Sequence, residues 1–249
     1  MVDAKSNELR MKRLQWDSEQ LGIGCGLIES TESIVGQNSK VSIDKIAKWL
    51  EANSDLEFIT VKATPEHLAV LNHCLSMGAY FADTKIMFKY SAHRNINLDR
   101  NSEYRIEIIK SIDSTPFLEL SEEMTSSRFY ADPKIGYTKA NRMWRTSIKN
   151  HCEGFVDKLQ IASKGDQPCG LIAIKFFNTD SLLLSIVGVI KAFQRRNIGN
   201  LMLRHILYRY AKDFTIFVET QATNIPAQKL YIKNGFEFHH ITHILHLWR

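Results

Sequence analysis

The sequence predicts an α/β fold. Segments with the period of a strand alternate with segments with the period of a helix along most of the 249 residues. Leu182–Ile190 is almost wholly apolar, which is typical of a strand covered on both faces. Because 44% of the residues are hydrophobic, the chain can bury a sizeable core. The length lies between that of one large domain and two small ones, and we expect two α/β domains.

A polar stretch separates these domains. Ser91–Glu103 interrupts the hydrophobic pattern with Asn, Asp, Arg and Ser, a composition that is typical of a linker. We predict a small α/β domain at residues 1–92, a linker at residues 93–103, and a larger domain at residues 104–249.

Helices and strands of the first domain follow from spacing. Ile43, Ile46 and Leu50 recur at helical intervals, and Gly78 is a good residue to end a helix. The expected elements are a helix over 42–52, a strand over 56–61, a helix over 65–77 and a strand over 85–90.

The second domain shows the same alternation over a longer stretch. Its helix near residue 144 places Asn141, Trp144 and Ile148 on one face and basic residues on another. The expected elements are a strand over 104–110, helices over 114–120 and 138–151, strands over 158–163, 170–177 and 182–190, a helix starting near Ile198, a strand over 214–220 and a helix over 226–233.

Charge and cysteine content exclude several classes of protein. The net charge is +5, and the basic residues are scattered among 27 acidic ones, so a small anionic ligand fits better than nucleic acid. The 4 cysteines lack C-x-x-C spacing, which predicts reduced thiols and no metal site. No apolar run is long enough to span a membrane and the first residues lack a signal-peptide pattern, so we expect a cytoplasmic location.

A turn between the apolar strand and the next helix is a candidate anion site. It reads Q-R-R-N-I-G-N, residues 194–200. Free backbone N–H groups at a helix start bind phosphate, and Arg195 and Arg196 would add positive charge. The alternative is an ordinary loop with two solvated arginines.

A second motif follows this turn. The pattern N-x-x-A-x-x-L-Y-x-K-x-G-F is filled by Asn224, Ala227, Leu230, Tyr231, Lys233, Gly235 and Phe236. Together, the turn and this pattern resemble the GNAT acyltransferase superfamily over residues 104–249. That family writes the turn Q/R-x-x-G-x-G/A, whereas this chain has Asn197 at the first Gly. Asn tolerates a left-handed backbone better than most residues, so we expect the turn to form.

The resemblance implies a fold, a co-substrate and a site. The fold would be the GNAT fold, a mixed central sheet flanked by helices, preceded by a smaller, degenerate GNAT-like α/β domain. The co-substrate would be acetyl-CoA with its pyrophosphate on the turn. Tyr231 would protonate the departing thiolate, unless it only packs on the final helix, and the Val189 N–H would bind the acetyl oxygen. The residues implied in donor binding are Val187, Val189, Gln194, Arg195, Arg196, Asn197, Ile198, Gly199, Asn200 and Asn224. No general base is singled out, since Glu219, Asp132, His240 or water could serve.

Motifs at both ends of the chain narrow the resemblance. The opening stretch L-Q-W-D-S-E-Q-L-G (residues 14–22), S-R-F (127–129) and the closing L-W-R are similar to those of dTDP-fucosamine N-acetyltransferases. These enzymes act on nucleotide-linked amino-deoxysugars for surface polysaccharides. The resemblance implies acceptor binding by Arg128, Phe129 and Trp16, although Trp16 could instead be a core anchor. Asp17 could cap a turn or touch ligand, and Gly22 is expected to serve backbone geometry.

Other readings stay open at this point. The chain could acetylate a protein, a polyamine or an antibiotic, or it could bind acetyl-CoA as a regulator without turnover. Arg142 and Arg145 are further candidates for binding an anionic acceptor, unless they only form a solvated helix face. Relatives in the family commonly pair through their C-terminal strands, so a homodimer is an expected partner state.

Overall fold

The computed structural model describes residues 9–30, 39–91, 96, 98 and 103–249. These residues form two compact units, each assembled from segments that are far apart in the sequence. The first unit contains the chain up to Lys85 together with residues 127–139 and 240–249, and the second contains residues 86–126 and 140–239. Most of the predicted linker lies outside the described residues. Both units combine helices with a sheet, which confirms the predicted α/β class.

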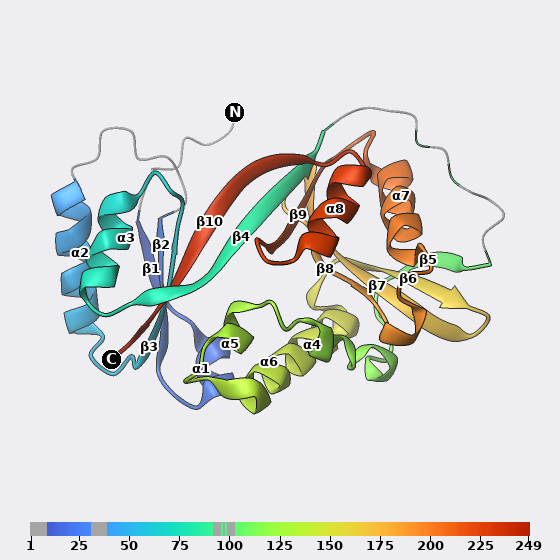
Figure 1. The fold of residues 1–249 in the computed structure, drawn as a ribbon. Coiled ribbons are helices and arrows are strands. Elements are labelled where there is room, and N and C mark those ends of the chain that lie inside the picture. Colours follow the sequence, from blue (N-terminus) through green and yellow to red (C-terminus); the bar gives the residue numbers. More distant parts are fainter. Residues whose placement is uncertain (1–8, 31–38, 92–95, 97, 99–102) are drawn as a thin grey trace. The chain divides into compact units, whose positions relative to one another are not determined.

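The first unit is a small mixed sheet with helices packed against it (Figure 1). β2 (Cys25–Ser30) pairs antiparallel with β1 (Arg10–Arg13) and parallel with β3 (Phe58–Ala63). Two of its helices bury Ile46 and Val70 in one apolar cluster with the strands, because their apolar residues recur on one face. The helices of this unit are α1 (Gln15–Leu21), α2 (Ser39–Ala52), α3 (Leu68–Ser76) and α5 (Arg128–Ala131).

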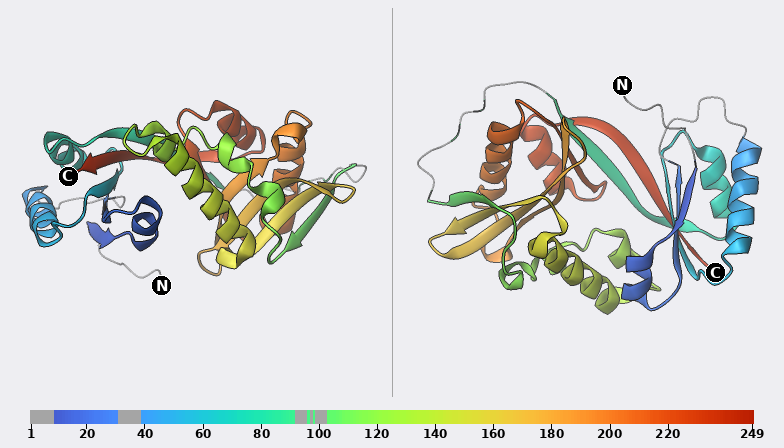
Figure 2. Two further views of the ribbon diagram at one scale, coloured as in Figure 1. Left: turned by 90° about the horizontal axis from the view of Figure 1, so that it is seen from below. Right: turned by 180° about the vertical axis from the view of Figure 1, so that it is seen from behind.

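The second unit contains an antiparallel meander followed by a parallel crossover. β5 to β8 pair antiparallel with their neighbours along the chain, and β8 then pairs parallel with β9 through the connecting helix α7. Figures 1 and 2 show α6 and α7 on opposite faces of the strands β6 to β8. The elements are β5 (Arg105–Ile109), α4 (Leu120–Glu123), α6 (Gly136–Asn150), β6 (Lys158–Lys164), β7 (Gln167–Phe176), β8 (Ser181–Val189), α7 (Ile198–Tyr210), β9 (Thr215–Gln221) and α8 (Ile225–Lys233).

Two long strands each contribute to both units. β4 (Tyr80–Tyr90) begins in the first unit, and its second half adds Phe88 and Tyr90 to the core of the second. β10 (Glu237–Trp248) begins in the second unit and ends antiparallel to β3, where His246 pairs with Thr60. The closing strand of the chain therefore completes the sheet of the first unit.

This division of the chain between the two units differs from the predicted domain boundaries. Residues 127–139 and 240–249, which the prediction assigned to the second domain, belong to the first unit. The physical reason is burial: Leu245 and Leu247 of β10 are both buried and share a cluster with Ile46 and Val70. The local sequence pattern identifies apolar residues in β10 but does not indicate in which of the two cores they are buried.

Most predicted elements are present, with shifted ends. The helix predicted over 114–120 is instead a short 3₁₀ turn, Thr115–Phe117, followed by α4. The prediction left residues 14–22 without a secondary structure; they contain α1, which ends at Gly22 in a left-handed conformation (φ 75°). Its N–H donates to the Ser18 carbonyl at 2.8 Å, so the expected backbone role of Gly22 is confirmed.

The role of β10 in the first core yields a stability prediction. Leu245→Ala is expected to lower the free energy of unfolding of the first unit by about 2–5 kcal/mol, because a fully buried leucine is lost. Urea unfolding followed by tryptophan fluorescence measures this, since Trp16, Trp49 and Trp248 belong to that unit. Phe238→Ala on the same strand is the control, because Phe238 is 61% exposed and should cost little. Equal losses in the two variants would contradict the assignment of β10 to this core.

Candidate active site

The site is built around the divergence of β8 and β9. Their register pairs run from Ser181 with Thr215 to Leu184 with Val218 and end there. Both strands continue, β8 to Val189 and β9 to Gln221. Beyond the last pair, the backbone groups that face the gap have no ladder partner across it, so polar groups of a ligand can bond to them.

A β-bulge lies where the divergence begins. Along the β7–β8 ladder, Ala173 faces Ile186 but Ile174 faces Leu184, so Ser185 is the extra residue on β8. An extra residue bends the strand that carries it. We attribute the separation of β8 from β9 to this bend, since β9 pairing ends at Leu184.

The candidate anion turn enters α7 through two left-handed residues. Arg195 has φ 60° and Asn197 has φ 63°, a conformation that is uncommon for residues other than Gly and more accessible to Asn than to Arg. Leu201 is the first residue whose N–H donates inside the helix, to the Asn197 carbonyl at 3.0 Å. The N–H groups of residues 198–200 precede it and have no partner inside the helix, so they form a set of donors with the positive end of the helix dipole.

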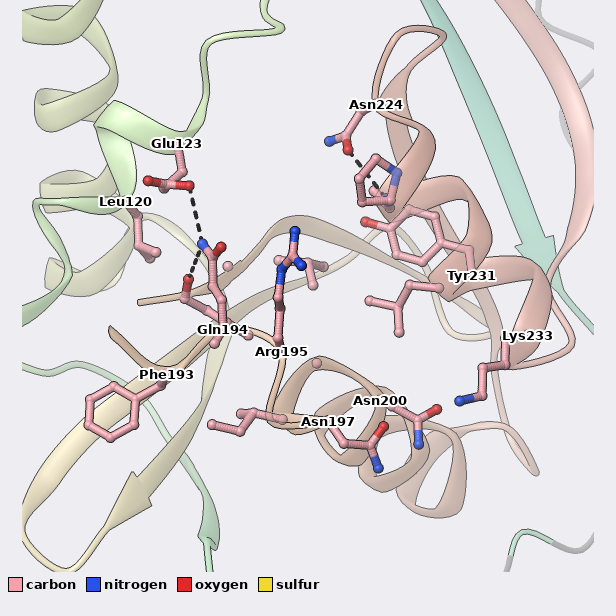
Figure 3. A pocket seen from close by; sticks show the side chains of 18 of the residues that line it. Leu120, Glu123, Phe193, Gln194, Arg195, Asn197, Asn200, Asn224, Tyr231 and Lys233 are labelled. Atoms are coloured by element: carbon pink, nitrogen blue, oxygen red, sulfur yellow. Dashed lines mark hydrogen bonds between the residues drawn. The ribbon is translucent and has the colours of Figure 1, made fainter. Parts of the chain in front are cut away.

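A cavity of about 630 Å³ lies between this turn, the end of β8 and α8. Figure 3 shows Arg195, Asn224 and Tyr231 around it. All the residues predicted to bind the donor line it, apart from Arg196. They are Val187, Val189, Gln194, Arg195, Asn197, Ile198, Gly199, Asn200 and Asn224, and Tyr231 lies with them.

Close packing of α7 on α8 shapes this cavity. A Cβ added at Gly199 would lie 3.2 Å from Cδ2 of Leu230, so the small residue lets the two helices approach. At the end of β8, a Cβ at Gly188 would lie 2.9 Å from Cδ1 of Leu120, which shows that α4 closes directly over the strand. The α4 side of the lining therefore combines apolar Leu120 and Met124 with Glu123, and the α7 side is rich in main-chain donors.

The Arg196 side chain does not line the donor cavity. It lines a neighbouring cavity of about 400 Å³ with Tyr104 and Arg204. Its guanidinium carbon lies 5.5 Å from the centre of the Phe193 ring. The positive charges that line the donor cavity thus come from Arg195 and Lys233, and the predicted role of Arg196 in donor binding stays a prediction.

Tyr231 is the side chain best placed for proton transfer. It is only 4% exposed and packs against Phe88 and Phe236 with ring centres 5.7 and 5.9 Å away. Burial raises the pKa of Tyr231 above its usual value of 10.0, so the phenol keeps its proton at neutral pH. In Figure 3 its oxygen is directed into the cavity. Asn224, which starts the same helix, accepts a hydrogen bond from the Ala227 N–H at 3.2 Å and fixes the start of α8.

The sequence analysis did not assign Glu123 or Lys233 to the site. Both line the cavity, and Glu123 is the only carboxylate among its described lining residues. The Gln194 side-chain amide donates to Glu123 Oε2 and to the Val189 carbonyl, each at 3.1 Å, and Lys191 Nζ lies 3.7 Å from Glu123 Oε1. Lys233 could have been found, since it is part of the second motif, whereas no local signal marks Glu123.

The residues predicted for the acceptor lie in the first unit. Arg128 donates to Thr60 Oγ1 at 2.7 Å and to Asp17 Oδ2 at 3.2 Å, and its guanidinium stacks 3.9 Å from the centre of the Phe129 ring. Trp16 is half-buried on α1. Because Arg128 already has these partners, its predicted contact with a diphosphate stays a prediction.

The candidate bases are not equivalent. Asp132 is buried, which opposes its ionisation, but hydrogen bonds from His246 and Trp248 outweigh burial and lower its pKa to about 2. A carboxylate this acidic and enclosed is a poor proton acceptor. Glu219 is half-buried and directly follows Val218, where pairing with β8 ends, and His240 is half-buried on β10. Neither one lines the cavity.

Neither a metal cluster nor a membrane-spanning helix is present in the described part of the chain. No group of three or more His, Cys, Asp or Glu side chains there could hold a metal ion, and all four cysteines are free and buried. None of the helices described has the length and apolar character needed to cross a bilayer.

Known proteins resemble this chain in sequence and in fold. The sequence model of the acetyltransferase (GNAT) family matches residues 117–236. The spore coat polysaccharide biosynthesis protein SpsD of Bacillus subtilis (strain 168) is 23% identical over 139 residues, which is 55% of this chain. The chain spans about half of that protein, since the match covers 48% of it.

Solved structures match over most of the chain. A functionally unknown conserved protein from Staphylococcus epidermidis has a TM-score of 0.64 at 14% identity, with 100% of this chain and 96% of that chain covered. A GCN5-related N-acetyltransferase from Sphaerobacter thermophilus has a TM-score of 0.60 at 11% identity, covering 96% and 76%. A tandem GNAT protein from the clavulanic acid biosynthesis pathway has a TM-score of 0.56 at 12% identity, covering 90% and 75%. These likenesses concern the fold.

The family match and the site agree in position. Residues 117–236 include α4, the bulged β8, the turn before α7, and Tyr231, which together enclose the cavity. The predicted enzyme class, an acyltransferase, is confirmed at the level of this domain. Residues 117–236 of the chain are similar to the acetyltransferase (GNAT) family over the elements that enclose the cavity.

Proposed function

We propose that the chain transfers an acetyl group from acetyl-CoA to the amine of a nucleotide-linked amino-deoxysugar, within a ternary complex. One observation carries the proposal: a single cavity joins the open edge of β8, the N–H groups that start α7, and the hydroxyl of Tyr231. Acetyl-CoA, the donor of the family, supplies an activated thioester. The residues present fit it, because main-chain donors suit its diphosphate and the apolar wall suits its arm.

Donor binding follows from the charges and donors at the turn. The N–H groups of residues 198–200 and the guanidinium of Arg195 would hold the diphosphate. The main chain of Val187 and Val189, on the part of β8 that β9 has left, would bond to the amides of the arm. The Gln194 side-chain amide donates a hydrogen bond to the Val189 carbonyl at 3.1 Å. When the CoA arm bonds to this carbonyl, the Gln194 amide would turn away and keep its hydrogen bond to Glu123.

The chemical step needs a proton acceptor for the amine, a donor to the oxyanion and a proton for the leaving thiolate. The amine nitrogen forms a bond to the carbonyl carbon and loses a proton to water or to a base, while the C–S bond breaks. The N–H of Val189 would stabilise the oxyanion, and Tyr231 would give its proton to the leaving thiolate. Because burial raises the pKa of Tyr231, the phenol carries that proton throughout the neutral range.

The acceptor class rests on separate support. The relative from Bacillus subtilis is named for polysaccharide biosynthesis, and the motifs at residues 14–22 and 127–129 resemble enzymes that acetylate nucleotide-linked amino sugars. A protein amine, a polyamine or an antibiotic is the alternative acceptor within the same chemistry.

Thiol release from acetyl-CoA with a panel of amines tests this proposal. We expect turnover with dTDP-4-amino-4,6-dideoxygalactose or a related nucleotide-linked amino sugar. Turnover only with a peptide, polyamine or antibiotic would refute the sugar acceptor. Binding of acetyl-CoA without turnover of any amine would identify a regulator instead.

Tyr231→Phe is expected to lower kcat by a factor of about 10²–10⁴ and to leave the affinity for acetyl-CoA nearly unchanged, because only the proton donor is lost. Steady-state kinetics and calorimetry measure the two quantities. Tyr210→Phe is the matched control, since Tyr210 is also buried but does not line the cavity. An unchanged kcat in Tyr231→Phe would remove the acid role.

Asn197 provides a test of the turn itself. Asn197→Val is expected to weaken acetyl-CoA binding about 5- to 30-fold, because a β-branched residue at φ 63° costs about 1–2 kcal/mol. Asn197→Gly should bind at least as well as the unmodified chain, since Gly adopts this conformation freely. Calorimetry with acetyl-CoA compares the three. Wild-type affinity in Asn197→Val would show that the turn does not hold the donor.

A further inference from the structure

A hydrogen bond joins the start of α7 to the end of α8 beside the donor cavity. Asn234 Nδ2 donates to Asn200 Oδ1 at 3.0 Å and to the Leu230 carbonyl at 2.8 Å. Asn200 is the third residue of α7, and Asn234 directly follows the last residue of α8. All three residues lie in the second unit, so these contacts are independent of the first. The proposed reaction does not account for Asn234, which is not among the described residues that line the cavity.

These contacts admit one orientation of the Asn234 amide. A backbone carbonyl can only accept a hydrogen bond, so the group that faces the Leu230 carbonyl must be the NH₂ and not the oxygen. The second proton of this NH₂ group then faces Asn200. Asn200 can accept it only through its own oxygen, and this turns the NH₂ group of Asn200 away from Asn234.

The end of α8 holds Asn234 in this place. Its backbone N–H donates to the Leu230 carbonyl at 3.2 Å and to the Tyr231 carbonyl at 3.0 Å. Gly235 follows in a left-handed conformation (φ 85°), which ends the helix. The side chain and the main chain of Asn234 therefore both bond to the last turn of α8, the turn that carries Tyr231.

The NH₂ group of Asn200 is available to a ligand. Asn200 lines the donor cavity, and Figure 3 shows it between Asn197 and Lys233. Asn200 is half-buried, and its Nδ2 has no acceptor within the described part of the chain. An amide NH₂ group donates to an anion, whereas the oxygen of the same amide can only accept and repels an anion. The orientation of Asn200 therefore decides whether its side chain attracts or opposes a diphosphate at the start of α7.

We propose that Asn234 is a positioning residue of the donor site, which holds the Asn200 amide so that its NH₂ group, and not its oxygen, faces the diphosphate of acetyl-CoA. This role rests on the proposed function, which supplies the ligand. Because Asn234 acts through Asn200, its effect should appear in the affinity for the diphosphate and not in proton transfer by Tyr231. Asn234 thereby ties the diphosphate end of the donor site to the helix that carries the proton donor.

Asn234→Asp tests this orientation with a side chain of nearly the same shape. A carboxylate cannot donate, so it accepts from the Asn200 NH₂ group and leaves the Asn200 oxygen facing the diphosphate. We expect CoA to bind about 10- to 50-fold more weakly, since an attractive contact with a charged group becomes a repulsive one. Asn234→Ala removes the constraint without adding charge and should weaken binding by about 3- to 10-fold. Calorimetry measures both affinities.

A second background separates the added charge from the orientation. In Asn200→Ala, the change of Asn234 to Asp should weaken CoA binding by about three-fold or less, because only the charge of the carboxylate then acts. Acetyl-pantetheine, which lacks the diphosphate, should bind every variant with nearly wild-type affinity. In steady-state kinetics, Asn234→Asp should raise the KM for acetyl-CoA and leave kcat nearly unchanged.

Gln228→Ala is the matched control for loosening of α8. The Gln228 side-chain amide also bonds to two carbonyls, at 3.2 Å to that of Gln221 and at 2.8 Å to that of Ala222, but at the other end of the helix. The CoA affinity of this variant should stay near that of the wild type. Equal losses of CoA affinity in Gln228→Ala and Asn234→Ala would show that Asn234 only supports the helix.

An NMR titration with inorganic pyrophosphate tests the site apart from any activity. We expect the side-chain amide signals of Asn200 to shift and saturate in the wild type and in Gln228→Ala, but not in Asn234→Asp. Shifts with pyrophosphate but no binding of acetyl-CoA would refute the proposed function and leave the role of Asn234 supported. Three results would overturn that role and leave the proposed function intact. They are wild-type CoA affinity in Asn234→Asp, an equal cost of this change with and without Asn200, and Asn200 signals that respond to neither pyrophosphate nor CoA.

Discussion

The loss of pairing between β8 and β9 beyond Leu184 and Val218 is the constraint on which the second unit depends. Two neighbouring strands in a sheet satisfy each other's backbone groups, and strands that separate leave these groups in need of other partners. The bulge at Ser185 bends β8 at that point, and the side chain of Gln194 bonds to the Val189 carbonyl where the strand ends. The neighbouring α7 adds a second set of unpaired groups. The cavity is thus a region of unsatisfied main chain, which suits a ligand rich in amides and phosphates.

In the first unit, the main constraint is the charge of Arg128, which is largely removed from solvent. The Arg128 side chain is only 13% exposed, and removing one partner of such a cation costs more than the pair itself gains. Asp17, Thr60 and neutral His246 each supply an acceptor, while Asp132 holds the imidazole in the tautomer that Arg128 needs. These partners come from four separate segments of the chain, so the hydrogen bonds of Arg128 and His246 link those segments within this unit. The ion pair with Arg128 gives Asp17 of the opening stretch a structural role in this unit.

Much of the second unit could be predicted because its signals are local. The apolar run of β8, the turn at residues 194–200 and the helix from Pro226 each depend on neighbouring residues, and the structure brings them to one cavity. Asn197 was expected to accept a left-handed backbone, and its φ of 63° agrees. The sequence could not predict that β4 and β10 each contribute to both units, which partners Arg128 has, or that Glu123 lines the cavity. Each depends on a contact between residues that are 60 or more positions apart, and a single sequence carries no record of such pairs.

Amide chemical shifts of isotope-labelled protein, recorded during a titration with CoA, test the central claim most directly. The account predicts that the largest changes fall on Ile198, Gly199 and Asn200, with a second group at Val187 and Val189. Saturable changes confined to other parts of the chain, or no changes at millimolar CoA, would show that the open main chain between β8 and α7 is not the donor site.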